Sequence, residues 1–207
     1  ESLNQEFSKQ ELSGRFATAL LGTFWGPTGA LALCNAGHPR PMWYRARTGR
    51  WEILAPAGGQ PESDDPVDVP LGVLDSTKYR QLEVRLRVGD LVLLYTDSLT
   101  EARLASGRLL GEEGLLGLLN RLGASDPPTL IARLLAAIDD LGGGGAIHHD
   151  VTALLLRPNG LTPPLTLGER ARALVHIVRG FLPGAGRSAA PEFGVKTVGG
   201  FLADRLN

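Results

Sequence analysis

The stretch that decides the fold is "DLVLLYTDSLTEAR", residues 90–103, in which an apolar run gives way to a polar one. The sequence Leu-Val-Leu-Leu-Tyr at residues 91–95 is typical of a strand that is buried on both faces. Thr96 and Asp97 follow directly. Burying the Asp97 carboxylate there without a partner would cost free energy. Two interpretations stay open. Either residues 98–101 form a capping box and start a helix, or Asp97 faces a cation.

A second segment, residues 148–158 ("HHDVTALLLRP"), begins polar and becomes apolar. If this strand neighbours residues 91–95 with both polar ends at one edge, Asp97 and Asp150 would lie on either side of a divalent cation, which prefers oxygen ligands. Adjacent strand residues face opposite sides, so at most one of His148 and His149 can join them. Asp150 can also be a turn residue, and on pattern alone the structural interpretation is the commoner one.

The order of the remaining segments indicates the fold class. Residues 15–25 and 30–37 are predicted to form a hairpin, and a second hairpin is predicted around residues 47–50. In residues 79–90 apolar and charged side chains alternate, which predicts a strand with one solvent-exposed face. Two helices are expected next, one over residues 112–122 and one capped by Asp126. Strands, then helices, then a strand predict an α+β fold with a mainly antiparallel sheet and helices on an outer face.

Composition excludes several classes of protein. The chain has 207 residues and a net charge of −1, so no basic field is available to attract nucleic acid. No run approaches the roughly 20 apolar residues of a membrane span, and we expect no membrane contact in this segment. The single cysteine, Cys34, excludes an internal disulfide framework and is expected to be a buried strand thiol. These features predict a cytoplasmic protein.

The last part of the chain, residues 159–207, is expected to be a helical extension. A capping box at residues 166–169 begins a helix whose apolar stripe must be buried. The stripe either packs back on the preceding domain or forms a homodimer contact. Because the chain begins at Glu1 without an initiator methionine, we expect it to be a piece of a longer or processed product.

Four motifs occur in a recognisable order: "CNAGHPRPMWY" (34–44), "PLGV" (70–73), "VGDLVLLYTDSLTEA" (88–102) and "HDVTALLLR" (149–157). In this order they resemble the stage II sporulation protein E type of serine phosphatase, in the metal-dependent protein phosphatase 2C superfamily. The resemblance covers roughly residues 1–158, as the C-terminal two-thirds of such a domain.

The resemblance implies a β-sandwich flanked by helices, with two Mn²⁺ or Mg²⁺ ions in a carboxylate cleft. A metal-bound water would attack a phosphoserine or phosphothreonine directly. By resemblance, Asp97 matches the aspartate of the family's Tyr-Thr-Asp-Gly motif, and His149 and Asp150 match its paired aspartates. We therefore expect Asp97, His149 and Asp150 to be metal ligands. The implied partner is a phosphorylated regulatory protein, such as an anti-sigma-factor antagonist.

The chain also departs from the family pattern. Ser98 stands where the family has glycine, and His149 replaces the first of the paired aspartates. The Gly-Gly-Asp and Asp-x-x-Gly-x-Gly motifs of the family do not occur before residue 15. We therefore expect this chain alone to be catalytically incomplete. The alternative is a non-catalytic, phosphatase-like interaction module that binds a regulatory protein.

Overall fold

A computed structural model of the chain describes residues 2–9, 16–55, 67–74, 77–147, 149–161 and 168. The chain divides into two compact units, residues 1–163 and 164–207. The architecture below belongs to the first unit. The helix expected from the capping box at residues 166–169 lies outside the described residues, apart from the helical residue Gly168. The homodimer contact through it stays a prediction.

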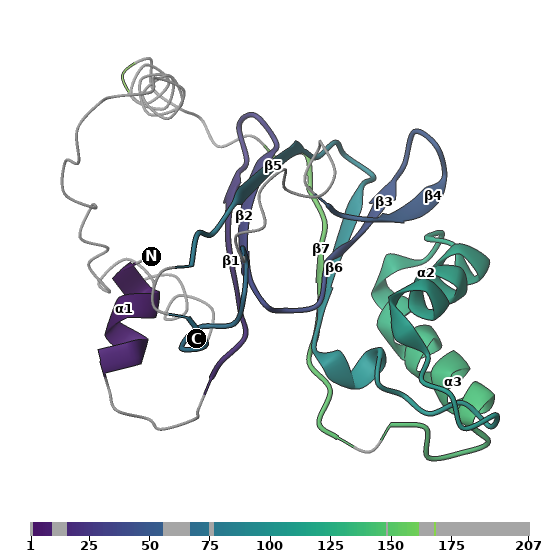
Figure 1. Cartoon of the computed structure of the whole chain (residues 1–207). Coiled ribbons are helices and arrows are strands. Elements are labelled where there is room, and N and C mark those ends of the chain that lie inside the picture. Colours follow the sequence, from purple (N-terminus) through teal and green to yellow (C-terminus); the bar gives the residue numbers. More distant parts are fainter. Residues whose placement is uncertain are drawn as a thin grey trace, which may run out of the picture. The chain divides into compact units, whose positions relative to one another are not determined.

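Among the described residues of the first unit, seven strands form two sheets (Figure 1), one ordered β1-β2-β5 and the other β4-β3-β6-β7, and all their pairings are antiparallel. The elements, in chain order, are α1 (Ser2–Lys9), β1 (Ala19–Trp25), β2 (Ala30–Ala36), β3 (Met42–Arg45), β4 (Arg50–Ile53), β5 (Gln81–Arg85), β6 (Leu91–Tyr95), the 3-10 turn η1 (Asp97–Leu99), α2 (Gly111–Leu122), the 3-10 turn η2 (Pro127–Thr129), α3 (Leu130–Gly142) and β7 (Ala153–Leu156).

The two sheets pack face to face through one apolar layer, here called the inner cluster. Strand β6 alternates, so that Val92 and Leu94 face this layer while their neighbours face the other side. The buried members of the inner cluster come from both sheets and from the residues that follow β4 and β5: Leu31, Leu33, Trp43, Leu54, Leu86 and Val92. The mainly antiparallel β-sandwich that the resemblance implied is therefore present.

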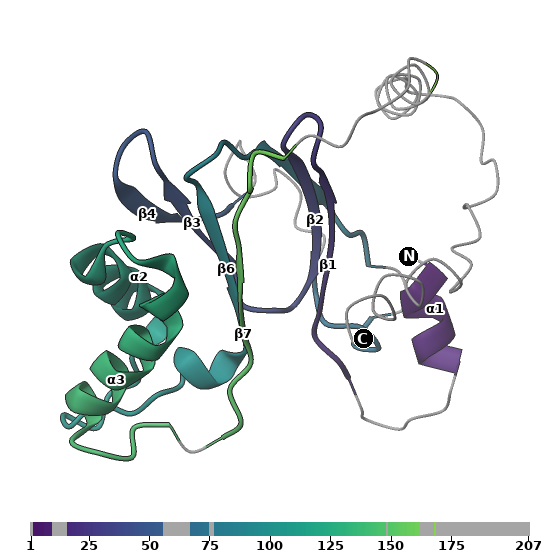
Figure 2. The ribbon, with the colours of Figure 1, turned by 180° about the vertical axis from the view of Figure 1, so that it is seen from behind.

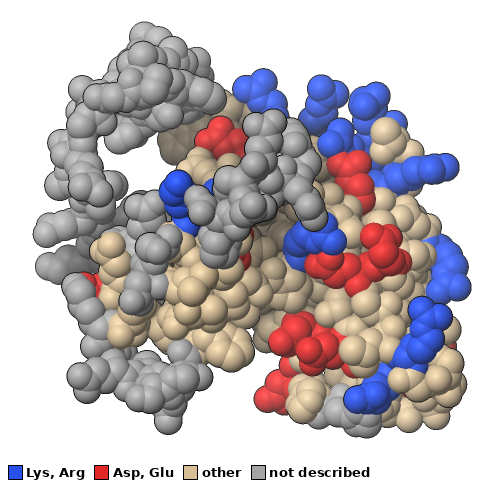
Figure 3. All heavy atoms as spheres, in the orientation of Figure 1, with Lys and Arg blue, Asp and Glu red and all other residues tan. Residues whose placement is uncertain are grey.

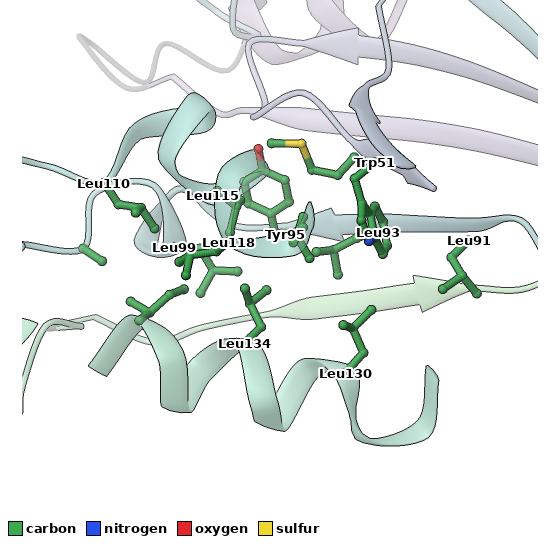
Figure 4. Close-up of a cluster of buried hydrophobic side chains, with 14 of the residues drawn as sticks. Trp51, Leu91, Leu93, Tyr95, Leu99, Leu110, Leu115, Leu118, Leu130 and Leu134 are labelled. Carbon is green, nitrogen blue, oxygen red and sulfur yellow. The ribbon is translucent and has the colours of Figure 1, made fainter. Parts of the chain in front are cut away.

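A second apolar layer, the outer cluster, lies between the β4-β3-β6-β7 sheet and the helices α2 and α3 (Figures 1 and 2). Figure 4 shows Tyr95 and Leu93 of β6 surrounded by leucines of both helices. The helical spacing of Leu130, Leu134, Ile138 and Leu141 predicts an apolar stripe on α3. The first three are at most 1% exposed, but Leu141, near the end of the helix, is 37% exposed. The same sheet thus buries one face against the other sheet and one against helices, which explains why β6 is apolar throughout.

The predicted hairpins at residues 15–37 and 42–53 are confirmed as β1–β2 and β3–β4. The prediction that Asp126 caps the following helix is wrong. A 3-10 turn comes first, and α3 begins at Leu130. Because Pro127 and Pro128 carry no N–H, the first amide available to Asp126 is that of Thr129, and it donates to the Asp126 main-chain carbonyl at 3.3 Å and not to the side chain. Its carboxylate instead accepts a hydrogen bond from the Thr129 hydroxyl at 2.5 Å.

Candidate functional site

Asp97 lies at the point where β6 leaves the sheet. Its main-chain carbonyl accepts hydrogen bonds from the amides of Thr100 and Glu101, both at 2.8 Å, and from the Thr100 hydroxyl at 2.9 Å. These bonds close the single 3-10 turn η1 and leave the Asp97 carboxylate exposed. The backbone at Asp97 is therefore fixed while its side chain is free to bind a ligand.

Ser98 joins the Asp97 segment to the Asp150 segment. The Ser98 side chain is only 6% exposed, and its hydroxyl donates a 2.7 Å hydrogen bond to the main-chain carbonyl of Asp150. Further along, the Thr96 amide donates to the Thr152 carbonyl at 3.0 Å, and the Thr152 amide donates to the Thr96 hydroxyl at 3.1 Å. Asp97 and Asp150 therefore share one end of the β6–β7 pair.

This arrangement bears on one of the two interpretations of residues 98–101, the capping box. The prediction that they form a capping box is wrong, because η1 ends at Leu99 and Thr96 at its N-cap makes no side-chain capping bond. The Ser98 hydroxyl is used for the bond to Asp150 instead of capping a helix. The expected shared edge of Asp97 and Asp150 is present.

His149 and Asp150 are both exposed and come before β7, which starts at Ala153. They are therefore not strand residues with alternating faces, as the sequence suggested, and His148 lies outside the described residues. Within the described ranges, no group of three or more His, Cys, Asp or Glu side chains could hold a metal ion. Asp97, His149 and Asp150 therefore do not form such a group among the described residues.

The loop between β2 and β3 reaches the same end of the sandwich, because β3 begins at Met42 opposite Leu93 of β6. The Asn35 side chain fixes this loop in both directions, since it accepts from the His38 amide at 2.7 Å and donates to the His38 carbonyl at 2.8 Å. The Thr18 hydroxyl lies 3.3 Å from His38 Nδ1. These bonds close a turn at the end of β2.

Arg40 ties this loop to the start of α2. Its guanidinium pairs with Glu112 Oε2, and its main-chain amide donates to Glu112 Oε1 at 3.1 Å. The hydrogen bond to Glu112 raises the pKa of Arg40 above its ordinary value. The pair is half-exposed and adds little net stability, but it sets the orientation of both side chains. No pattern in the sequence indicates a contact between residues this far apart.

Burial shifts the pKa values of two side chains near this end. Burial, followed by the charge of Glu112, raises the pKa of the Tyr95 phenol, whose hydroxyl has no hydrogen-bond partner among the described atoms. Burial also raises the pKa of the Cys34 thiol, so Cys34 lacks the thiolate character of a nucleophile. The Cys34 side chain is half-buried, less than the sequence predicted.

The Ser98 bond gives a direct test of how the shared end is held. Replacing Ser98 with alanine is expected to lower the free energy of unfolding by about 0.5–1.5 kcal/mol, the net value of one such hydrogen bond. Amide hydrogen exchange at Val151 and Thr152 is expected to speed up. Thr100→Ala is the matched control, because the Asp97 carbonyl keeps two main-chain donors without that hydroxyl. Equal effects of the two substitutions would contradict the role given to Ser98.

One known protein family matches most of this chain. The family described as Stage II sporulation protein E (SpoIIE) matches residues 1–159, more than half of the chain. The chain belongs to the SpoIIE family. The match ends close to the boundary at residue 158 that the motifs suggested. No curated protein sequence matches the chain.

Solved structures share this SpoIIE fold. The RsbU and RsbW domains of Rv1364c from Mycobacterium tuberculosis are 25% identical, with a TM-score of 0.58 over 86% of this chain and 47% of that one. The SiaA-PP2C domain of Pseudomonas aeruginosa is 21% identical (TM-score 0.56; 74% of this chain, 57% of that one). The SpoIIE phosphatase domain of Bacillus subtilis, from a manganese-presoaked structure, is 16% identical (TM-score 0.51; 71% and 58%).

The SpoIIE-family chain therefore spans about half the length of these neighbours. In the part of the chain that the structure describes, no helix is long and apolar enough to cross a membrane. Acidic side chains gather near the middle of the face drawn in Figure 3, and basic side chains lie mainly toward its upper and right-hand margins. That face carries both signs of charge, and the numbers of acidic and basic residues in the whole chain are nearly equal.

Proposed function

We propose that this chain is part of a metal-dependent protein serine/threonine phosphatase domain and that Asp97, Asp150 and His149 contribute ligands to its Mn²⁺ or Mg²⁺ site. The observation that carries the proposal is the hydrogen bond from Ser98 to Asp150, since it holds the two carboxylate-bearing segments together. Membership of the SpoIIE family and the shared sandwich fold support the same conclusion.

The chain alone is catalytically incomplete under this proposal. Mg²⁺ requires near-octahedral oxygen coordination, and the described part of the chain offers no cluster of three suitable side chains. A bound divalent ion supplies an activated water and neutralises phosphate charge. Asp97 and Asp150 contribute negative charge at one end of the β6–β7 pair, and the Ser98 and Thr96 bonds hold their two segments together.

The proposed substrate is a phosphorylated regulatory protein, such as an anti-sigma-factor antagonist, in a cytoplasmic setting. A regulatory role is supported by the Mycobacterium tuberculosis neighbour, which joins an RsbU domain to an RsbW domain. The single cysteine supports a reducing compartment.

A second candidate function is a non-catalytic module that binds a regulatory protein through the same fold. The observation that favours it is His149, which places a neutral nitrogen donor where the resembled family has a carboxylate and suits Mg²⁺ poorly.

Manganese titration of the chain tests the phosphatase proposal. We expect Mn²⁺ to bind more weakly than about 0.1 mM, because affinity at oxygen sites follows the number and charge of ligands, and we expect no turnover of a phosphoserine peptide. Asp97→Asn and Asp150→Asn should each remove most of this binding. Asp140→Asn, an exposed carboxylate on α3, is the control and should bind as the wild type does.

Two results would contradict parts of this account. Tight stoichiometric Mn²⁺ binding with turnover would contradict the expected catalytic incompleteness of the chain, while supporting the phosphatase function. Mn²⁺ binding that survives both Asp97→Asn and Asp150→Asn would show that these residues are not ligands and would favour the interaction module.

A further inference from the structure

A pocket of about 240 Å³ lies between the two sheets, beside the loop that joins β2 to β3. Its apolar lining comes from both sheets and from that loop: Leu20, Leu33, Leu54, Leu82 and Pro41. Its polar lining is Asn35, His38, Arg40, Asp68 and Arg80. The pocket therefore has an apolar floor and a charged rim, which is the usual composition of a binding site.

The pocket and the two carboxylates share one end of the sandwich. The β2–β3 loop crosses at the end where Met42 pairs with Leu93, and the same end carries the exit of β6 at Asp97 and the approach to β7 at Asp150 (Figures 1 and 2). A polypeptide that presents a phosphate to a cation held by Asp97 and Asp150 would therefore lie at the same end of the sandwich as the pocket.

The rim is held rigidly by hydrogen bonds that the interior packing does not require. The Asp68 carboxylate accepts from the main-chain amide and from Nε of Arg80, both at 2.7 Å, and the Asp68 carbonyl accepts from the Gly37 amide at 2.7 Å. Asp68 has a φ of 56°, a left-handed conformation that is uncommon for a residue other than glycine. Together with the Asn35 and Glu112 bonds described above, this makes a preorganised site.

The size of the pocket limits what it can bind. Pockets for drug-sized ligands and cofactors occupy roughly 300–1,000 Å³, so a pocket of about 240 Å³ suits a single side chain better than a cofactor. The leucine floor requires that side chain to be apolar. The side chains of Arg40 and Arg80 are 51% and 37% exposed at the rim, where they pair with Glu112 and Asp68. Their positive charge suits a ligand that carries a phosphate nearby.

We propose that this pocket receives an apolar side chain of the phosphoprotein substrate, close in its sequence to the phosphorylated residue. The inference rests on the proposed phosphatase function, because it assigns the pocket to the same substrate. The SpoIIE-family domain would then select substrates by two features at once, a phosphate at the carboxylate end and a leucine-sized residue in the pocket.

Binding of phosphoserine peptides in a glycine and serine background tests this inference. Each peptide carries one leucine at a different position, and the leucine-free peptide is the reference. We expect at least one leucine position to bind about tenfold or more tightly than the reference, as burial of a leucine side chain allows. Methyl NMR signals of Leu20, Leu33, Leu54 and Leu82 should shift with that peptide.

A matched pair of variants on β1 locates the binding. Leu20→Phe fills the pocket and should remove the preference for leucine. Leu21 lies next to Leu20 on β1, is 54% exposed and does not line the pocket. Leu21→Phe should therefore keep the preference for leucine. If Leu20→Phe fails to fold, Leu82→Phe fills the pocket from β5 and makes the same test. Peptides bound without regard to leucine, or a leucine preference that survives both pocket-filling variants, would overturn the inference.

The result of the leucine test can be distinguished from the result of the Mn²⁺ titration. A leucine preference in a chain that binds no Mn²⁺ would overturn the metal-site proposal and leave the pocket assignment standing. Mn²⁺ binding that depends on Asp97 in a chain indifferent to leucine would overturn the pocket assignment alone.

Discussion

Replacing Leu99 with alanine is expected to lower the free energy of unfolding by about 2–5 kcal/mol, measured by chemical denaturation. The Leu99 side chain is fully buried in the outer cluster (Figure 4), so truncation loses its transfer free energy and leaves a cavity. Leu99 also belongs to η1, the turn that begins at Asp97. The substitution should therefore weaken the fold and the shared carboxylate end together.

Leu109→Ala is the matched control, because Leu109 is 50% exposed. Its effect should stay within about 0.5 kcal/mol, as is usual for surface positions. A loss in Leu99→Ala no larger than in the control would contradict the packing of η1 against the helices.

Substituting Gly37 with alanine is the second large effect that we expect, about 2–4 kcal/mol of unfolding free energy, from a left-handed backbone and a steric clash added together. Gly37 has a φ of 67°, and a Cβ at this position would overlap Pro70, with Cδ of that proline only 2.6 Å away. The Gly37 amide also donates to the Asp68 carbonyl at 2.7 Å, which ties the same two segments together.

Gly107→Ala separates the two contributions. Gly107 has a φ of 79°, but nothing lies within 4 Å of the added Cβ. This control should show only the backbone cost, about 1–2 kcal/mol. If both variants lose the same stability in thermal or chemical unfolding, the close contact of Gly37 with Pro70 does not exist in solution.

The fold was predictable to the extent that its signals are local. Alternating apolar residues and turn glycines identified the two hairpins, and an uninterrupted apolar run identified β6 as a strand covered on both faces. The same reasoning overestimated how deeply β7 is buried. Its apolar run suggested burial, but β7 is an edge strand and Leu154 is 52% exposed.

The site was predictable only in part. The motif order led to Asp97 and Asp150, and the structure brings their segments together. The contact that does so was not foreseen, since Ser98 was expected to matter only as a missing glycine or a capping residue. The Arg40–Glu112 pair and the pocket depend on residues from distant parts of the chain. A single sequence holds no local signal for such contacts.

The most direct test of the central proposal, that Asp97 and Asp150 form one cation-facing end, is residue-resolved NMR line broadening by Mn²⁺. The account predicts that low Mn²⁺ concentrations first broaden the amide signals around Asp97 and those around Asp150 together, and that Asp97→Asn reduces broadening in both segments. Broadening centred on another acidic segment, or on only one of the two with the other unaffected, would contradict the account.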